Sequence, residues 1–142
     1  MTARNARRRA REYALRALYE WQLSGNAVSE IRAGIAEDED FDKADGRYFR
    51  GLVDGVTAAS GELEALLAPA LDRKPAELSP VEHAILLLGA YELRSAPDVP
   101  YRVVINEAVE LAKSYGGTDG HKYVNGVLDK LAAQLRPAER AR

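Results

Sequence analysis

The stretch SPVEHAILLLGAY, residues 79–91, decides the fold class of this 142-residue chain. It opens as a capping box, in which the Ser79 hydroxyl accepts a hydrogen bond from the first turn and Pro80 takes the first helical position. From Ala84 to Tyr91 the residues are apolar nearly all round, which is typical of a helix in the middle of a bundle. We therefore expect a central helix here, ending near Ser95.

Apolar residues recur at helical spacing on both sides of this stretch. No segment alternates with period two for long enough to be a strand, so we predict an all-α fold for a single domain, 1–142. The bundle would have six to seven helices in two helical subdomains, about 1–74 and 75–142. The expected helices cover about 5–24, 28–35, 45–68 with a bend or break near Ser60-Gly61, 79–95, 100–115 and 119–136.

A few side chains have an expected place in these helices. Asp45 and Asp119 precede helices and can cap them. Tyr115 falls on the apolar face of its helix, and Gly126 is expected to permit close helix packing. The acidic stretch 37–40 is expected to be a solvated turn.

Composition limits the class of protein. The chain has no Cys, which excludes disulfides, thiolate metal sites and a Cys nucleophile. Its longest apolar run is far shorter than the roughly 20 residues that a membrane span needs. The N-terminus has no apolar stretch typical of a signal peptide. We expect a soluble, cytoplasmic protein that makes no membrane contact.

Charge is distributed unevenly along the chain. The net charge is −2, but the first eleven residues carry +5 and no acid, so the remainder carries −7. Guanidinium groups bind phosphate through paired, permanently charged donors, and they also stack on unpaired bases. This arginine arm therefore predicts an RNA contact, although a solvated N-terminus is an equal alternative by spacing alone. The arm consists of Arg4, Arg7, Arg8, Arg9 and Arg11.

The loop GGTDGHKY, residues 116–123, is a second candidate for RNA binding. It joins the end of one helix to the start of the next, where free backbone N–H groups and Lys122 could hold a phosphate. Tyr123 offers a ring on which a base could stack. By spacing alone a tight helix–helix turn is the simpler interpretation. The loop lacks the ending of a P-loop, so we do not expect it to bind nucleoside triphosphates.

The sequence gives little indication of an enzyme. His83 and His121 are the only histidines, and neither has a partner four residues away that would make a metal pair. We predict no catalytic residues, no metal and no cofactor. A solvent-facing charge ladder is expected for three residues of one helix, Glu107, Glu110 and Lys113.

A protein partner is suggested by an aromatic residue beside acids. Tyr19 lies off the apolar stripe of the first helix and next to Glu20, and Glu82 opens the central helix. Single exposed aromatic residues are common, so this pattern is weak alone.

Several motifs, in order and in register, resemble those of the NusB family. The likeness extends over about four fifths of the chain, and residues 26–44 carry little of it. The motifs are ARRRARE (6–12), ALY (17–19), WQ (21–22), YFR (48–50), VPY (99–101), INEAVELAK (105–113) and HKYVNGVLD (121–129).

The resemblance implies two helical subdomains and a role in transcription antitermination. It implies binding of boxA RNA together with NusE, a small-subunit ribosomal protein, in the RNA polymerase elongation complex with other Nus factors, notably on ribosomal RNA operons. The RNA surface would comprise the arginine arm with Asp119, Lys122 and Tyr123. The partner surface would include Tyr19 and Glu82.

Other functions are compatible with the residues. The chain could be a NusB-like domain that serves an RNA methyltransferase, although it has no Gly-rich strand–helix motif of its own for a methyl donor. It could be a structural adaptor or a homodimer that covers the RNA surface. A helix-turn-helix DNA binder fits less well, because the basic residues cluster at one terminus.

Overall fold

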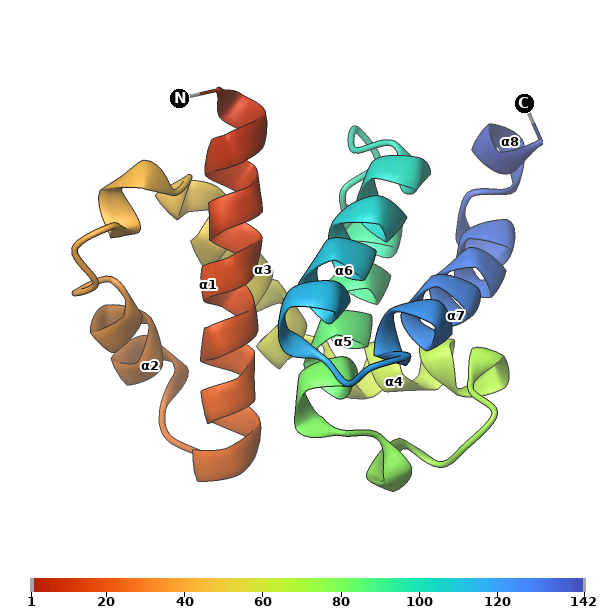
Figure 1. Ribbon diagram of the computed structural model, residues 1–142, viewed down its shortest axis with the longest axis horizontal. Helices are drawn as coiled ribbons and strands as arrows, with labels where there is room; N and C mark the ends of the chain where they lie inside the picture. Colours follow the sequence, from red (N-terminus) through yellow and green to blue (C-terminus); the bar gives the residue numbers. More distant parts are fainter. Residues whose placement is uncertain (1, 142) are drawn as a thin grey trace. The chain divides into compact units, whose positions relative to one another are not determined.

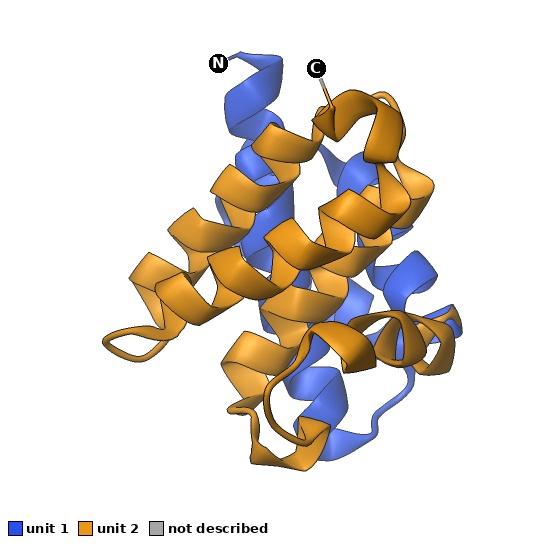
Figure 2. Ribbon diagram, turned by 90° about the vertical axis from the view of Figure 1, so that its right-hand side faces the viewer, with its two compact units in different colours: residues 1–58 blue, residues 59–142 orange. Residues whose placement is uncertain are grey.

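The structure is a computed structural model that describes residues 2–141, and within them it contains α-helices and short 3-10 turns but no strand (Figure 1). The helices form two compact units, which divide between Ala58 and Ala59 (Figure 2). We call them unit 1 and unit 2. The predicted all-α fold is confirmed.

Unit 1 is a three-helix unit in which α1 contacts α2 and α3, and α2 contacts α3. The Thr2 hydroxyl caps α1 by accepting from the Asn5 N–H at 3.1 Å. Gly25 ends α1 in the left-handed region, at a φ of 68°, which a side chain would disfavour. Its elements are α1 (Ala3–Ser24), α2 (Val28–Ile35), the 3-10 turn η1 (Phe41–Lys43) and α3 (Gly46–Ala58).

Aromatic rings and small residues fill the core of unit 1. Phe41 packs edge to face against both Tyr13 and Phe49, with ring centres 5.1 Å apart in each of these two pairs. Small residues on α1 let the other helices approach closely. The buried apolar residues of α1 and α3 are Ala10, Tyr13, Ala14, Leu15, Ala17, Leu18, Phe49, Leu52, Val53 and Val56.

The acidic turn after α2 is tied to α1. The Tyr13 hydroxyl donates to Asp38 Oδ1 at 2.9 Å, and the Asp40 N–H donates to the same oxygen at 2.9 Å. Burial, and then this bond to Asp38, raise the pKa of Tyr13 to about 12. The turn was expected to be solvated, but Asp38 serves as a structural anchor within it.

Unit 2 is built around α5, which contacts α4, α6 and α7. Its residues from Ala84 to Ala90 are all buried, as the apolar stretch predicted. The Ser79 hydroxyl caps the helix by accepting from the Glu82 N–H at 3.1 Å, also as predicted. The elements are α4 (Ser60–Leu67), η2 (Ala68–Ala70), η3 (Pro75–Glu77), α5 (Pro80–Ser95), α6 (Tyr101–Tyr115), α7 (Gly120–Leu135) and α8 (Pro137–Arg140).

Helices α5 and α7 pack closely at Gly89. A Cβ added there would lie only 2.6 Å from Leu128 Cδ1, and Leu128 is fully buried. By contrast, a Cβ at Gly126 would meet nothing within 4 Å. The expectation that Gly126 permits close packing is therefore wrong, and Gly89 has that role.

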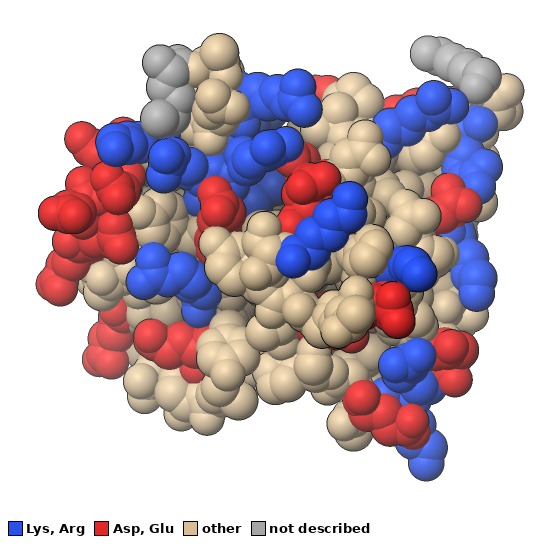
Figure 3. Space-filling model, in the orientation of Figure 1, with Lys and Arg blue, Asp and Glu red and all other residues tan. Residues whose placement is uncertain are grey.

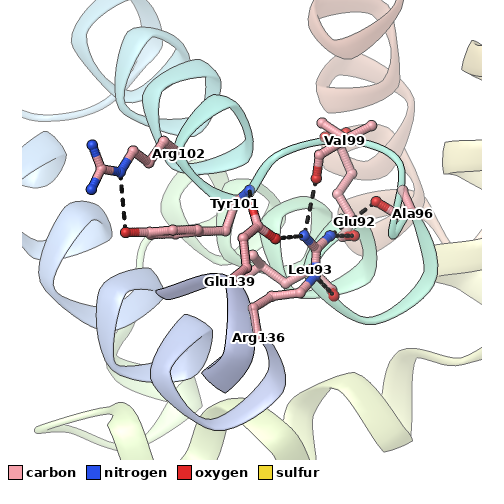
Figure 4. A network of polar contacts seen from close by, with 8 residues as sticks. All are labelled: Glu92, Leu93, Ala96, Val99, Tyr101, Arg102, Arg136 and Glu139. Carbon is pink, nitrogen blue, oxygen red and sulfur yellow. Dashed lines mark hydrogen bonds and ion pairs between the residues drawn. The ribbon is translucent and has the colours of Figure 1, made fainter. Parts of the chain in front are cut away.

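A buried arginine closes the connection between α5 and α6 (Figure 4). Arg136 follows α7, and its guanidinium donates to four carbonyl oxygens at the end of α5 and in the loop beyond it. It also pairs with Glu139 Oε1 at 2.6 Å, while Glu139 Oε2 accepts from the Tyr101 N–H at 2.7 Å. Cation and anion thus lie at the helix ends that favour them. The four carbonyls are those of Glu92, Leu93, Ala96 and Val99, at 2.8–3.2 Å.

Most predicted helix boundaries agree with the structure. The Asp45 side chain caps α3 by accepting from the Tyr48 N–H at 3.0 Å, and the expected break near Ser60 separates α3 from α4. The units divide after Ala58, whereas the sequence predicted subdomains of about 1–74 and 75–142. The reason is that α4 contacts α5 and α7.

Two side chains of α6 differ from the prediction in their exposure to solvent. Tyr115 is 48% exposed, although it was expected on the apolar face. Glu107 is 5% exposed, so it is not part of a solvent-facing ladder. Among the residues described, no helix is long and apolar enough to cross a membrane.

Candidate nucleic-acid interface

The first turns of α1 carry the arginine arm. Arg4 and Arg8 are exposed, and Arg7 and Arg9 are half-buried. Figure 3 shows basic side chains gathered around these turns and acidic ones over the segment between α2 and α3. Thr2 caps the helix ahead of them, so the arm is held in helical form up to its start.

The arm is braced by Tyr48 at the start of α3. The guanidinium carbon of Arg7 lies 4.5 Å from the centre of the Tyr48 ring, and that of Arg11 lies 5.4 Å from it. Arg11 is only 4% exposed. It therefore belongs to the packed part of unit 1, while Arg4 and Arg8 are exposed.

A backbone bond joins the arm to the cap of α3. The Asp45 N–H donates to the Ala6 carbonyl at 2.9 Å. The Asp45 carboxylate, which caps α3, also lies 4.0 Å from Arg7 Nε. These contacts fix the position of Arg7. The negative charge of Asp45 also offsets part of the attraction between Arg7 and an approaching phosphate.

The loop before α7 presents an exposed ion pair. Lys122 Nζ lies 3.4 Å from Asp119 Oδ1, and about three quarters of each side chain is accessible. Asp119 occupies the N-cap position, but its side chain makes no capping hydrogen bond. The prediction that Asp119 caps the helix through its side chain is therefore wrong. Both groups remain accessible to a ligand.

Tyr123 is half-buried in unit 2 and has a cation over its ring. The guanidinium carbon of Arg73 lies 4.1 Å from the ring centre. The Tyr123 hydroxyl is buried beside Asp72, and burial raises the pKa of Tyr123. The ring is thus partly covered by Arg73 rather than an open platform.

The two candidate partner residues differ in exposure. Tyr19 is exposed on α1, as its position off the apolar stripe predicted. Glu82 is half-buried on α5, and its carboxylate reaches the loop before α7. A Cβ added at Gly120 would lie 2.7 Å from Glu82 Oε2. Glu82 is therefore a neighbour of the predicted RNA-binding loop.

Sequence reasoning missed two members of these clusters. Tyr48 stands in a stretch whose only signal is its likeness to a family motif, and its contact with the arm crosses from α1 to α3. Arg73 stands in the link before α5, where only its charge was a signal. Neither contact has a sequence spacing that would reveal it. No group of three metal-ligating side chains occurs between residues 2 and 141.

Comparisons with known proteins show the family to which the chain belongs. The family model described as "NusB family" matches residues 8–133. The chain is 57% identical over 136 residues to the transcription antitermination protein NusB of Nitrosomonas eutropha, covering 96% of this chain and 81% of that protein. It is 56% identical to the protein of the same name in Thiobacillus denitrificans, covering 94% and 92%.

Solved structures show the same fold. Thermotoga maritima NusB superposes with a TM-score of 0.85 at 30% identity, covering 95% of this chain and 96% of that one. A crystal structure of the antitermination factors NusB and NusE in complex with dsRNA gives a TM-score of 0.82 at 28% identity, covering 89% and 96%.

Proposed function

This chain belongs to the NusB family, and from that premise we propose that it is a transcription antitermination factor. It binds boxA RNA together with NusE. The complex joins the RNA polymerase elongation complex with other Nus factors, notably on ribosomal RNA operons. The protein acts in the cytoplasm, where it binds RNA and protein partners and catalyses no reaction.

The observation that carries this proposal is the braced arginine arm. Arg4 and Arg8 extend from a capped helix whose base is fixed by Tyr48 and Asp45. Because the helix that carries these side chains is already formed, it loses little backbone freedom when it binds a polyanion, so its charges contribute efficiently to affinity. Arg7 and Arg9 would add phosphate contacts at the side of the row. Arg11 supports the arm through Tyr48.

The loop before α7 would complete the RNA surface. Lys122 would contact a phosphate, and Tyr123 would belong to the part that holds unpaired bases. Asp119 pairs with Lys122 and would moderate its attraction for RNA. The likeness to a NusB in complex with NusE and dsRNA supports RNA binding by this chain, and the contacts of this loop are part of the proposal.

NusE would bind at a surface that includes Tyr19 and Glu82. An exposed aromatic ring and a carboxylate suit a partner with basic and apolar side chains. The contact of Glu82 with the loop before α7 means that a partner bound there would touch a neighbour of the RNA site. This arrangement supports a joint protein–RNA surface, on which the complex binds RNA more tightly than either protein alone.

The test is fluorescence anisotropy of a labelled boxA RNA titrated with this protein, with and without NusE. A scrambled RNA of equal length is the control. We expect tighter binding to boxA, strengthened by NusE. Equal affinity for both RNAs would reduce the function to electrostatic attraction. No affinity for either RNA, from folded protein, would contradict the proposal and favour an occluding homodimer or a structural adaptor.

A further inference from the structure

A layered cluster of three side chains lies at the predicted RNA-binding loop. Arg73 comes from the segment between η2 and η3, and its guanidinium carbon lies 4.1 Å from the centre of the Tyr123 ring. Asp72 Oδ1 accepts from Arg73 Nε at 2.8 Å, and this bond holds the pKa of Asp72 below its ordinary value. Arg73 is therefore fixed on two sides, by a ring and by a carboxylate.

The outer side of Arg73 is open. Its side chain is 40% exposed, although its guanidinium carbon lies close to the centre of the Tyr123 ring. Within residues 2–141 its hydrogen bond is through Nε, and the terminal nitrogens Nη1 and Nη2 have no hydrogen-bond partner there. The Arg73 side chain is thus bonded to Asp72 through Nε and lies over Tyr123, yet it remains partly accessible to a ligand.

We propose that Arg73 is a further RNA-contacting residue, on whose outer face an unpaired base stacks. The inference rests on the proposed RNA binding of this loop. Guanidinium planes stack on splayed bases as aromatic rings do, and Tyr123 beneath gives the stack a fixed floor. The sequence suggested that a base would stack on Tyr123. On the face that Arg73 covers, Arg73 is instead the surface that meets the base.

Local charge favours a base over a phosphate as the group that Arg73 holds. Asp72 forms an ion pair with Arg73 and neutralises it, and Glu82 is close enough to act on Arg73 electrostatically. The net attraction for a phosphate is therefore small at this point. Stacking depends on the planar face and survives neutralisation by Asp72.

The test combines a protein change with an RNA change. Arg73→Lys keeps the charge and removes the plane, while Arg73→Ala removes both. Each is titrated against the labelled boxA RNA and against a series in which one nucleotide at a time is abasic. We expect both variants to bind the intact RNA roughly tenfold more weakly, as for the loss of one stacked base. At the position of the stacked base, the abasic change should weaken RNA binding by the wild type roughly tenfold as well. It should leave RNA binding by the two variants almost unchanged.

The control is Lys74→Ala, an exposed residue of like charge beside Arg73. It should keep the full abasic penalty at that position. Thermal unfolding of all variants should match the wild type, since Arg73 is exposed. If the effects of the Arg73 change and of the abasic change were additive at every position, Arg73 would have no role in stacking. The same conclusion would follow if the Arg73 variants lost only NusE binding. A wild type without RNA affinity would instead defeat the proposed function itself.

Discussion

At the scale of single residues, the closest approach of two helices depends on Gly89. A methyl group there would overlap Leu128, which is fully buried and cannot turn toward solvent. We expect Gly89→Ala to lower the free energy of unfolding by about 1–3 kcal/mol, as overpacking of a core does. Urea denaturation followed by far-UV circular dichroism measures this difference.

Gly126→Ala is the matched control on the facing helix. It adds the same methyl group in a helix interior, but into open space. Alanine favours a helix over glycine by up to about 1 kcal/mol, so this variant should be as stable as the wild type or more stable. Equal destabilisation by both changes would mean that the contact with Leu128 is not the cause.

The residues that sequence patterns misplaced are mostly charged. Glu107 recurs with other charges at helical spacing, so it was expected to face solvent, yet it is buried. Arg136 lies between the end of α7 and Pro137. Nothing in the sequence around it predicts that its side chain would reach the end of α5. The partners of such groups are distant in sequence. Periodicity gives the apolar face of a helix but does not reveal which charge is satisfied inside.

At the scale of elements, Arg136 holds α5, α6 and α8 together. Removing its side chain would leave buried carbonyls unsatisfied at the end of α5 and Glu139 without its partner. We expect Arg136→Ala to lower the free energy of unfolding by roughly 3–5 kcal/mol, because several buried carbonyls lose their donor and each unsatisfied group costs about 1–3 kcal/mol. Urea denaturation again gives the value.

Arg140→Ala serves as the control four residues later. Arg140 pairs with Asp129 at 2.7 Å, but both side chains are substantially exposed. A surface pair of this kind contributes less than about 1 kcal/mol. A loss at Arg136 no greater than at Arg140 would refute the importance of the buried network.

Helix positions were predicted well where local signals define them. Ser79 and Asp45 are caps that the sequence reveals, and both make the expected bonds. The structure divides the units after Ala58, earlier than the predicted division near residue 75. What assigns α4 to unit 2 is its packing against α5, which is a tertiary contact.

At the scale of the whole molecule, a basic arm of +5 opens a chain whose remainder carries −7. Attraction for RNA should therefore arise largely from the arm. We expect the double variant Arg4→Ala, Arg8→Ala to flatten the dependence of log K on log salt by roughly 0.7 for each phosphate that the arm no longer neutralises. Its affinity should fall by a similar factor for boxA and scrambled RNA, because binding to phosphates carries no sequence information.

Arg16→Ala is the control for charge alone. Arg16 lies on the same helix and is exposed, but it pairs with Asp38 and stands outside the arm. For the Arg16→Ala variant, the dependence of log K for RNA on log salt should equal that of the wild type. An unchanged slope in the double variant would remove the arm from the RNA-binding surface, and a fall only for boxA would assign it a part in sequence recognition.

The network around Arg136 also bears on the order in which the chain folds during synthesis. Translation produces Leu93 and Val99 first, and Arg136 follows them by 43 and 37 residues. Until then the carbonyls at the end of α5 can be satisfied only by water. The central helix of unit 2 is therefore synthesised well before the residue that bonds its end. A chain that stops before residue 136 lacks the guanidinium that would satisfy these carbonyls.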